Sequence, residues 1–125
     1  MNKSTIISIV SLVAILLVVS GIVAYASHPK LQYSQDVLTG VAKALAAKQV
    51  TMYGAAWCPH CQAEKARFGD AFQYVPYVEC PANEKLCLDK GVKGYPTWIA
   101  ADGTKYEGEQ GIQKLAEIAG YALPQ

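Results

Sequence analysis

An apolar segment near the N-terminus, residues 5–25, contains no charged side chain. About 20 apolar residues in a helix cross the hydrocarbon core of a bilayer, since each residue adds about 1.5 Å. Roughly 95 of the 125 residues then remain, which is enough for one small domain. The sequence therefore predicts a transmembrane signal-anchor with its flanks over residues 1–29 and a single folded domain over residues 30–125.

The same segment can also be interpreted as a cleaved secretory signal. Lys3 supplies a positive n-region, and residues 24–26 read Ala-Tyr-Ala, the small-x-small form that signal peptidase accepts. The apolar run exceeds the about 7–15 residues of an ordinary signal, which favours an uncleaved anchor. Because the positive end of a signal-anchor normally stays inside, both interpretations place the domain outside the cytoplasm, in a periplasm, at a cell surface or in a thylakoid lumen.

The charge balance gives no indication of a nucleic-acid partner. The chain carries 11 Lys and Arg against 10 Asp and Glu, a net charge of +1. No basic surface for nucleic acid or anionic lipid is predicted from that balance. The chain's four cysteines are Cys58, Cys61, Cys80 and Cys87. An even number of cysteines in an exported domain is typical of disulfide chemistry, so partners are sought through these residues.

Local patterns predict an α/β domain. Strands are expected over residues 50–53, 77–80, 97–100 and 104–106, and helices over residues 34–48, 59–69, 83–90 and 112–119. The order is a helix followed by βαβαββα, which buries a mixed four-stranded sheet between helices, because its parallel pair needs a crossover and its final hairpin does not. Pro76 cannot donate a ladder hydrogen bond, so the second strand is expected at a sheet edge.

The chemistry is concentrated in Cys58-Pro59-His60-Cys61. Pro59 suits the first turn of a helix and places Cys58 at its N-terminus, where free amide groups and the helix dipole stabilise a thiolate. Cys61 follows three residues later on the same face, within reach of a mixed disulfide at Cys58. Pro59 rigidifies the turn, and His60 is expected to tune the couple towards a more oxidising disulfide. We predict that Cys58 attacks and Cys61 resolves, with no dissociable cofactor.

Two segments resemble the thioredoxin superfamily: AAWCPHC at residues 55–61 and GYPTW at residues 94–98. The wider set YGAAWCPHC, YVEC, LC and GVKGYPTW is similar to the thioredoxin-like domain associated with bacterial and plant vitamin K epoxide reductase homologues. The quinone-reducing four-helix bundle of those proteins is missing from this chain. The resemblance therefore implies exchange of disulfides with exported cysteine-containing proteins, and reoxidation by a separate quinone-linked membrane reductase.

The resemblance also implies roles for residues outside the cysteine motif. Pro96 would be the cis-proline that faces the disulfide, and Tyr95 would offer backbone hydrogen bonds to a bound peptide. Thioredoxins carry a buried acid six residues before the first cysteine, where this chain has Met52. The proton acceptor for Cys61 would then be Glu64 or water.

The aromatic residues near the motif are candidates for a substrate platform. Trp57 and Tyr95 are the expected platform residues, whereas Tyr53 and Trp98 are expected in the core. The chain also has a glutaredoxin-like stretch at residues 50–61, but no identifiable glutathione-binding set accompanies it.

The role of Cys80 and Cys87 is open from the sequence. As a structural disulfide the pair would add roughly 2–3 kcal/mol, and as a second redox pair it would relay electrons to or from Cys58 and Cys61. A zinc site is disfavoured, because the second pair's spacing fits a ribbon poorly and neither His28 nor His60 adds ligand spacing. The sequence is also compatible with a reductant, an isomerase or a non-catalytic tethered binding module, since the direction of exchange depends on potential and partner.

Overall fold

The computed structural model describes residues 2–26 and 32–125. The chain divides into two units, Met1–Lys30 and Leu31–Gln125, each of which is described by itself. The predicted domain boundary between residues 29 and 30 lies outside the described residues, as does His28.

Helix α1 (Lys3–Ala26) forms the first unit and has 24 residues. Its apolar side chains up to Gly21 are exposed, and none of its candidate spanning segment is buried against protein. By length and composition the helix is able to cross a membrane, although a signal sequence near an N-terminus meets the same criteria. The apolar helix is thus confirmed, and the choice between anchor and cleaved signal stays a prediction.

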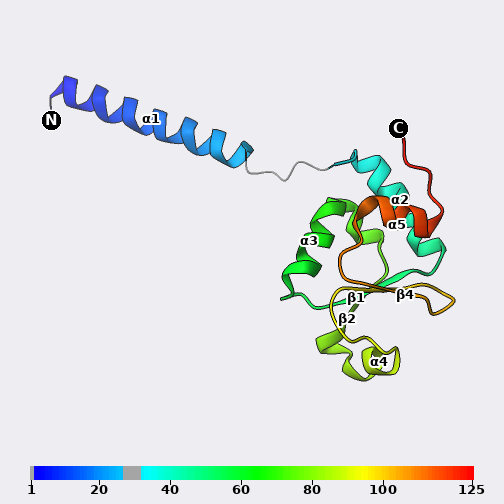
Figure 1. Cartoon of the computed structure of the whole chain (residues 1–125). Helices are drawn as coiled ribbons and strands as arrows, with labels where there is room; N and C mark the ends of the chain where they lie inside the picture. Colours follow the sequence, from blue (N-terminus) through cyan, green and yellow to red (C-terminus); the bar gives the residue numbers. More distant parts are fainter. Residues whose placement is uncertain (1, 27–31) are drawn as a thin grey trace. The chain divides into compact units, whose positions relative to one another are not determined.

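The second unit is a four-stranded sheet with helices on both faces (Figure 1). Its strands are β1 (Thr51–Gly54), β2 (Tyr77–Glu79), β3 (Thr97–Ile99) and β4 (Lys105–Glu107), and its helices are α2 (Gln35–Ala47), α3 (Pro59–Phe68), α4 (Glu84–Asp89) and α5 (Gly111–Ala119). The strand order is β2-β1-β3-β4, with β1 parallel to β2 and the other pairs antiparallel. This mixed sheet confirms the predicted α/β fold and its βαβαββα order after an initial helix.

Side chains of the two central strands alternate between the two faces of the sheet, as the period of a strand requires. Met52 and Trp98 are paired across β1 and β3, and both are fully buried in the main core. Tyr53 and Ile99 belong to a second cluster, which also contains Cys80 and Cys87. The predicted core positions of Tyr53 and Trp98 are therefore confirmed.

Helix α2 begins where its sequence predicted. Ser34 is the N-cap, and its hydroxyl oxygen accepts a hydrogen bond from the amide of Val37 at 3.5 Å. The helix packs against α5, and its buried face brings Leu38, Val41 and Leu45 into the main core. Apolar residues spaced three and four positions apart therefore form the helix face that packs against the main core.

Strand β2 lies at the edge of the sheet, as Pro76 predicted. Pro76 itself precedes the strand, and its carbonyl accepts a hydrogen bond from the amide of Met52 at 2.9 Å. The predicted end of this strand at Cys80 is wrong by one residue, because Cys80 begins a 3-10 helix, η2 (Cys80–Ala82), with Pro81 in its first turn. A second 3-10 helix, η1 (Gly69–Tyr74), was not predicted and follows the end of α3.

Candidate active site

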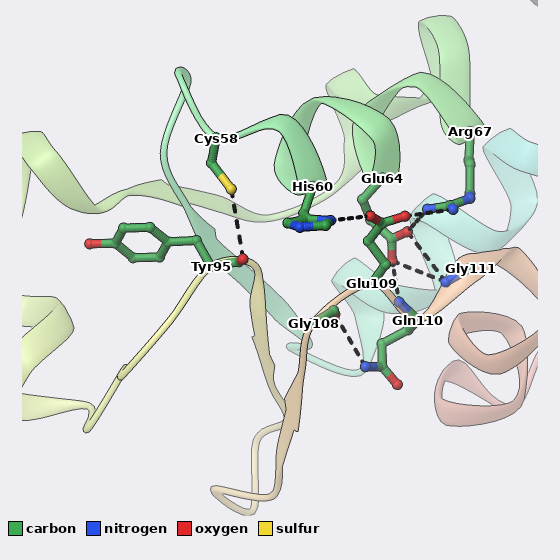
Figure 2. A network of polar contacts seen from close by, with 9 residues as sticks. All are labelled: Cys58, His60, Glu64, Arg67, Tyr95, Gly108, Glu109, Gln110 and Gly111. Atoms are coloured by element: carbon green, nitrogen blue, oxygen red, sulfur yellow. Dashed lines mark hydrogen bonds and ion pairs between the residues drawn. The ribbon is translucent and has the colours of Figure 1, made fainter.

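Cys58 is the N-cap of α3, and Pro59 occupies the first turn, as predicted. The Cys58 side chain points to the carbonyl of Tyr95, with its Sγ atom 3.7 Å from that oxygen (Figure 2). Only 6% of the residue is exposed, so Cys58 is nearly enclosed at the helix end. The free amide groups of the first helical turn favour negative charge at this place.

Cys61 lies one turn into α3 and is fully buried. Burial, together with contact with Cys58, raises the pKa of the Cys61 thiol to about 11. Gly54 leaves the room that this sulfur occupies, because a Cβ atom at that position would lie only 2.7 Å from Cys61 Sγ. Both cysteines are free thiols, so the site presents one marginally accessible thiol backed by one enclosed thiol.

Tyr95 and Pro96 lie beside the Cys58 thiol. The peptide bond between them is cis, the isomer that the sequence resemblance implies. Pro96 is buried, and its carbonyl accepts a hydrogen bond from the amide of Gly108 at 2.7 Å. Trp57 is 68% exposed and packs edge-on against the Tyr95 ring, with centroids 6.1 Å apart. The two aromatic residues expected in a substrate platform are thus brought together next to Cys58.

His60 is directed away from the Cys58 sulfur and towards Glu109 (Figure 2). Its Nδ1 atom lies 2.6 Å from a Glu109 carboxylate oxygen, and Arg67 contacts the other oxygen at 2.6 Å. The hydrogen bond from His60 and then that from Arg67 lower the pKa of Glu109. Any stability from this lowered pKa is present above the unfolded-state pKa and is lost as the pH falls through the folded one. No sequence pattern singled out Glu109, since the pairing joins residues far apart in the chain.

Glu64 is a fully buried carboxylate on α3. It accepts hydrogen bonds from the backbone amides of Gln110 at 2.9 Å and Gly111 at 3.1 Å, and from Arg67 at 2.5 Å (Figure 2). The two amides belong to the N-terminus of α5, where a negative charge is favoured. The expectation that Glu64 serves Cys61 is not supported, because both carboxylate oxygens are engaged at the junction between α3 and α5.

Cys80 and Cys87 form a disulfide that joins η2 to α4, with 5.8 Å between their Cα atoms. Both residues are buried, and Tyr53 and Ile99 pack in the same cluster. Cys58 and Cys61 belong instead to the main core on the other side of β1. The pairing is that expected from the sequence, while its role as a staple or a relay stays a prediction.

Replacing both Cys80 and Cys87 with serine is expected to lower the free energy of unfolding by about 2 kcal/mol, because the disulfide closes a short loop in the unfolded chain. For a domain of this size the melting temperature would fall by about 10 °C. Near-UV circular dichroism of the full chain in detergent would measure the change. The rate of exchange at Cys58, taken well below the melting temperature, is the control. An unchanged rate supports a staple, and a rate loss in the folded variant would instead indicate a relay.

The site contains no obvious metal centre. Within residues 2–26 and 32–125, no three His, Cys, Asp or Glu side chains converge to hold a metal ion. The residues that converge are instead the two thiols, the Tyr95 carbonyl and the polar set around Glu109. The thioredoxin-like class of proteins is defined by three features that this domain has: a mixed four-stranded sheet, a Cys-x-x-Cys pair at the start of a helix, and a cis-proline beside that pair.

Comparison with known proteins agrees with this class. The family described as Thioredoxin matches residues 31–122, and the chain belongs to that family. Thiol-disulfide oxidoreductase LTO1 of Arabidopsis thaliana is 37% identical over 101 residues, which cover 74% of this chain and 27% of that protein. A probable protein disulfide-isomerase ER-60 of Schistosoma mansoni is 30% identical over 82% of this chain and 23% of its own length. A protein disulfide-isomerase of Aspergillus niger is 33% identical over 57% of this chain and 15% of its own length. The chain thus spans about a quarter or less of each of these relatives.

Proposed function

We propose that the protein is a thiol-disulfide oxidoreductase in which Cys58 is the nucleophile and Cys61 the resolving thiol. The observation that carries this proposal is the asymmetry of the two thiols: Cys58 caps a helix beside the Tyr95 carbonyl, and Cys61 is enclosed behind it. An accessible thiol can meet a protein substrate, and an enclosed thiol can react only with its neighbour. The names of the relatives, which include oxidoreductases and isomerases of disulfides, support the same chemistry.

The proposed exchange conserves thiols and electrons at each step. With the Cys58–Cys61 disulfide formed, a substrate thiolate attacks Cys58 Sγ, and Cys61 leaves as a thiolate that takes up a proton. A second substrate thiolate then attacks the substrate sulfur of the mixed disulfide and releases Cys58. The substrate gains a disulfide, and the protein takes up two electrons as two thiols. The reverse sequence reduces a substrate disulfide.

The substrate platform is proposed from the residues around Cys58. Trp57 offers exposed aromatic surface beside the partly buried Tyr95, and the backbone at Tyr95 and Pro96 would hold an extended peptide next to the sulfur. His60 and Pro59 are proposed to tune the couple. The contact between His60 and Glu109 supports such a role, because it fixes the imidazole in the first turn of the helix that Cys58 caps.

The location and partner are part of the same proposal. Helix α1 would anchor the domain at the outer side of a membrane, where exported proteins acquire disulfides. A separate quinone-linked membrane reductase would accept the two electrons and restore the Cys58–Cys61 disulfide. This partner is supported by the similarity of the cysteine motifs to the thioredoxin-like domain of vitamin K epoxide reductase homologues.

A redox titration of the full chain in detergent tests the function. The chain is equilibrated in glutathione buffers of graded potential, and free thiols are trapped and counted at each poise. A two-electron transition at Cys58 and Cys61 near about −120 mV would indicate a disulfide donor, and one near about −270 mV a reductant. The absence of any reversible transition at these cysteines would contradict the proposed function.

A further inference from the structure

The resolving thiol lies in an enclosed place that strongly disfavours its charged form. Cys61 must lose its proton before it attacks the sulfur of Cys58, and burial makes this loss costly. Met52 occupies the strand position at which thioredoxins carry the buried acid that accepts the proton of the resolving thiol. Glu64 accepts hydrogen bonds from the backbone amides at the start of α5 instead. A backbone hydrogen bond at Ala55 opposes part of the increase in the Cys61 pKa, and a nearby cation would stabilise the thiolate further.

Lys65 is the cation placed to act on this sulfur. It follows Cys61 by four residues on α3, so the two side chains share one helix face. The charge of Lys65 opposes the effect of burial on the pKa of Cys61. A lysine on the surface of a helix is usually solvated and has no effect on a buried thiol. The position of the Lys65 ammonium group decides whether Lys65 is solvated in this way or acts on Cys61.

The Lys65 ammonium is held over the ring of Tyr77, with Nζ 3.6 Å from the ring centroid. The edge of the same ring and the Cys61 sulfur border one space: a Cβ atom placed on Gly54 would lie 2.7 Å from Cys61 Sγ and 3.3 Å from Tyr77 Cε2. The cation therefore lies over the face of a ring whose edge borders the same space beside Gly54 as the sulfur.

Glu79 completes this arrangement from β2. Its carboxylate accepts a hydrogen bond from the Tyr77 hydroxyl and a second from the amide of Ala56, at 2.9 Å in the latter case. These two hydrogen bonds and the nearby charge of Lys65 lower the pKa of Glu79. An ionised carboxylate at this position holds the Tyr77 ring through its hydroxyl and attracts the nearby Lys65 ammonium.

We propose that Lys65 is a positioning residue for the resolving step: its ammonium group, held over the Tyr77 ring, stabilises the thiolate of Cys61 while that sulfur attacks Cys58. This inference rests on the proposed function. In the step, the Cys61 proton passes to solvent and the thiolate forms a bond to Cys58 Sγ. The bond from Cys58 Sγ to the substrate sulfur breaks, and the substrate leaves as a thiolate.

The step can be isolated by reacting the reduced full chain, in detergent and with its Cys80–Cys87 disulfide intact, with dithiobis(nitrobenzoate). Cys58 displaces one thionitrobenzoate in a phase whose rate depends on the reagent concentration. Cys61 then displaces the second thionitrobenzoate in a phase whose rate does not depend on the reagent concentration. Stopped-flow absorbance, recorded from about pH 6 to about pH 10, would separate the two phases and give the pH profile of each.

Lys65→Met is expected to slow the second phase and move its pH profile upward, while leaving the first phase nearly unchanged. Each unit of increase in the Cys61 pKa lowers the thiolate fraction about tenfold, and the greater nucleophilicity of the more basic thiolate offsets part of this loss. A net slowing of about threefold per pKa unit follows. The titratable or charged groups around Cys61 that bear on the profile are Cys58, Lys65, Tyr77 and, beyond it, Glu79.

Two variants make the result specific. Lys65→Arg keeps a cation over the ring and is expected to retain the second-phase profile. Lys43→Met removes a comparable cation on α2, which lies 4.8 Å from the ring centroid of Tyr74, and is expected to change neither phase. A second phase in Lys65→Met with the rate and pH profile of the wild type, or equal slowing in Lys43→Met, would overturn the inference. A wild-type chain that releases no thionitrobenzoate contradicts the proposed function itself and, with it, this inference.

Discussion

Replacing Cys58 with serine is expected to abolish disulfide exchange, with a loss of at least about a thousandfold in rate. A serine hydroxyl is not ionised at neutral pH and cannot form the mixed disulfide. Cys61 cannot take over, because it is fully buried and its pKa is raised by that burial. The assay would follow the transfer of a disulfide between the full chain in detergent and a reduced, unfolded test protein.

Cys61→Ser is the matched variant, because it removes the other thiol of the pair and leaves Cys58 in place. It is expected to react once with a substrate disulfide and then to remain as a mixed disulfide, since the resolving thiol is missing. Trapped adducts would be detected as mass increases that reducing agent reverses. Adducts on Cys61 in the Cys58→Ser variant, formed at a rate near that of the wild type, would reverse the assignment of the two roles.

Replacing Glu64 with alanine is expected to lower the free energy of unfolding by about 3 kcal/mol or more. The substitution leaves the amides of Gln110 and Gly111 without their acceptor, and each unmade hydrogen bond in a buried place costs about 1–3 kcal/mol. Arg67 keeps Glu109 as a partner and is 41% exposed, so the loss is mainly at the backbone of α5. Urea unfolding followed by tryptophan fluorescence would measure the effect.

Glu64→Gln is the matched control, because it keeps the shape and one acceptor oxygen but removes the charge. It is expected to cost less than the alanine variant, since one of the two amides can still be satisfied. Equal losses in the two variants would mean that the charge carries the effect. A loss below about 1 kcal/mol in Glu64→Ala would show that the buried carboxylate does not hold the start of α5 in place.

The fold and the central part of the site could be predicted because their signals are local. Cys58, Pro59 and Cys61 lie within one turn of chain, and Pro59 fixes the start of the helix. The same holds for the start of α2, which was expected near residue 34. The edge position of β2 followed from the missing amide of Pro76, although the strand itself starts one residue later.

The polar environment of the site could not be predicted because it depends on distant pairings. Glu109 meets His60 across 49 residues, and Glu64 meets Gln110 across 46. A single acidic residue in a loop has no pattern that distinguishes it from a solvated one. The place of Lys65 over Tyr77 likewise depends on the register between β1 and β2, which sets that ring next to Gly54.

The contact between His60 and Glu109 has a consequence for the growing chain. Synthesis runs from the N-terminus, so the ribosome delivers the histidine between the two reactive cysteines 49 residues before it delivers the carboxylate that pairs with it. The amides that donate hydrogen bonds to Glu64 arrive at the same late stage. Until α5 has been made and docked, the helix that carries Cys58 and Cys61 therefore lacks these contacts of His60 and Glu64.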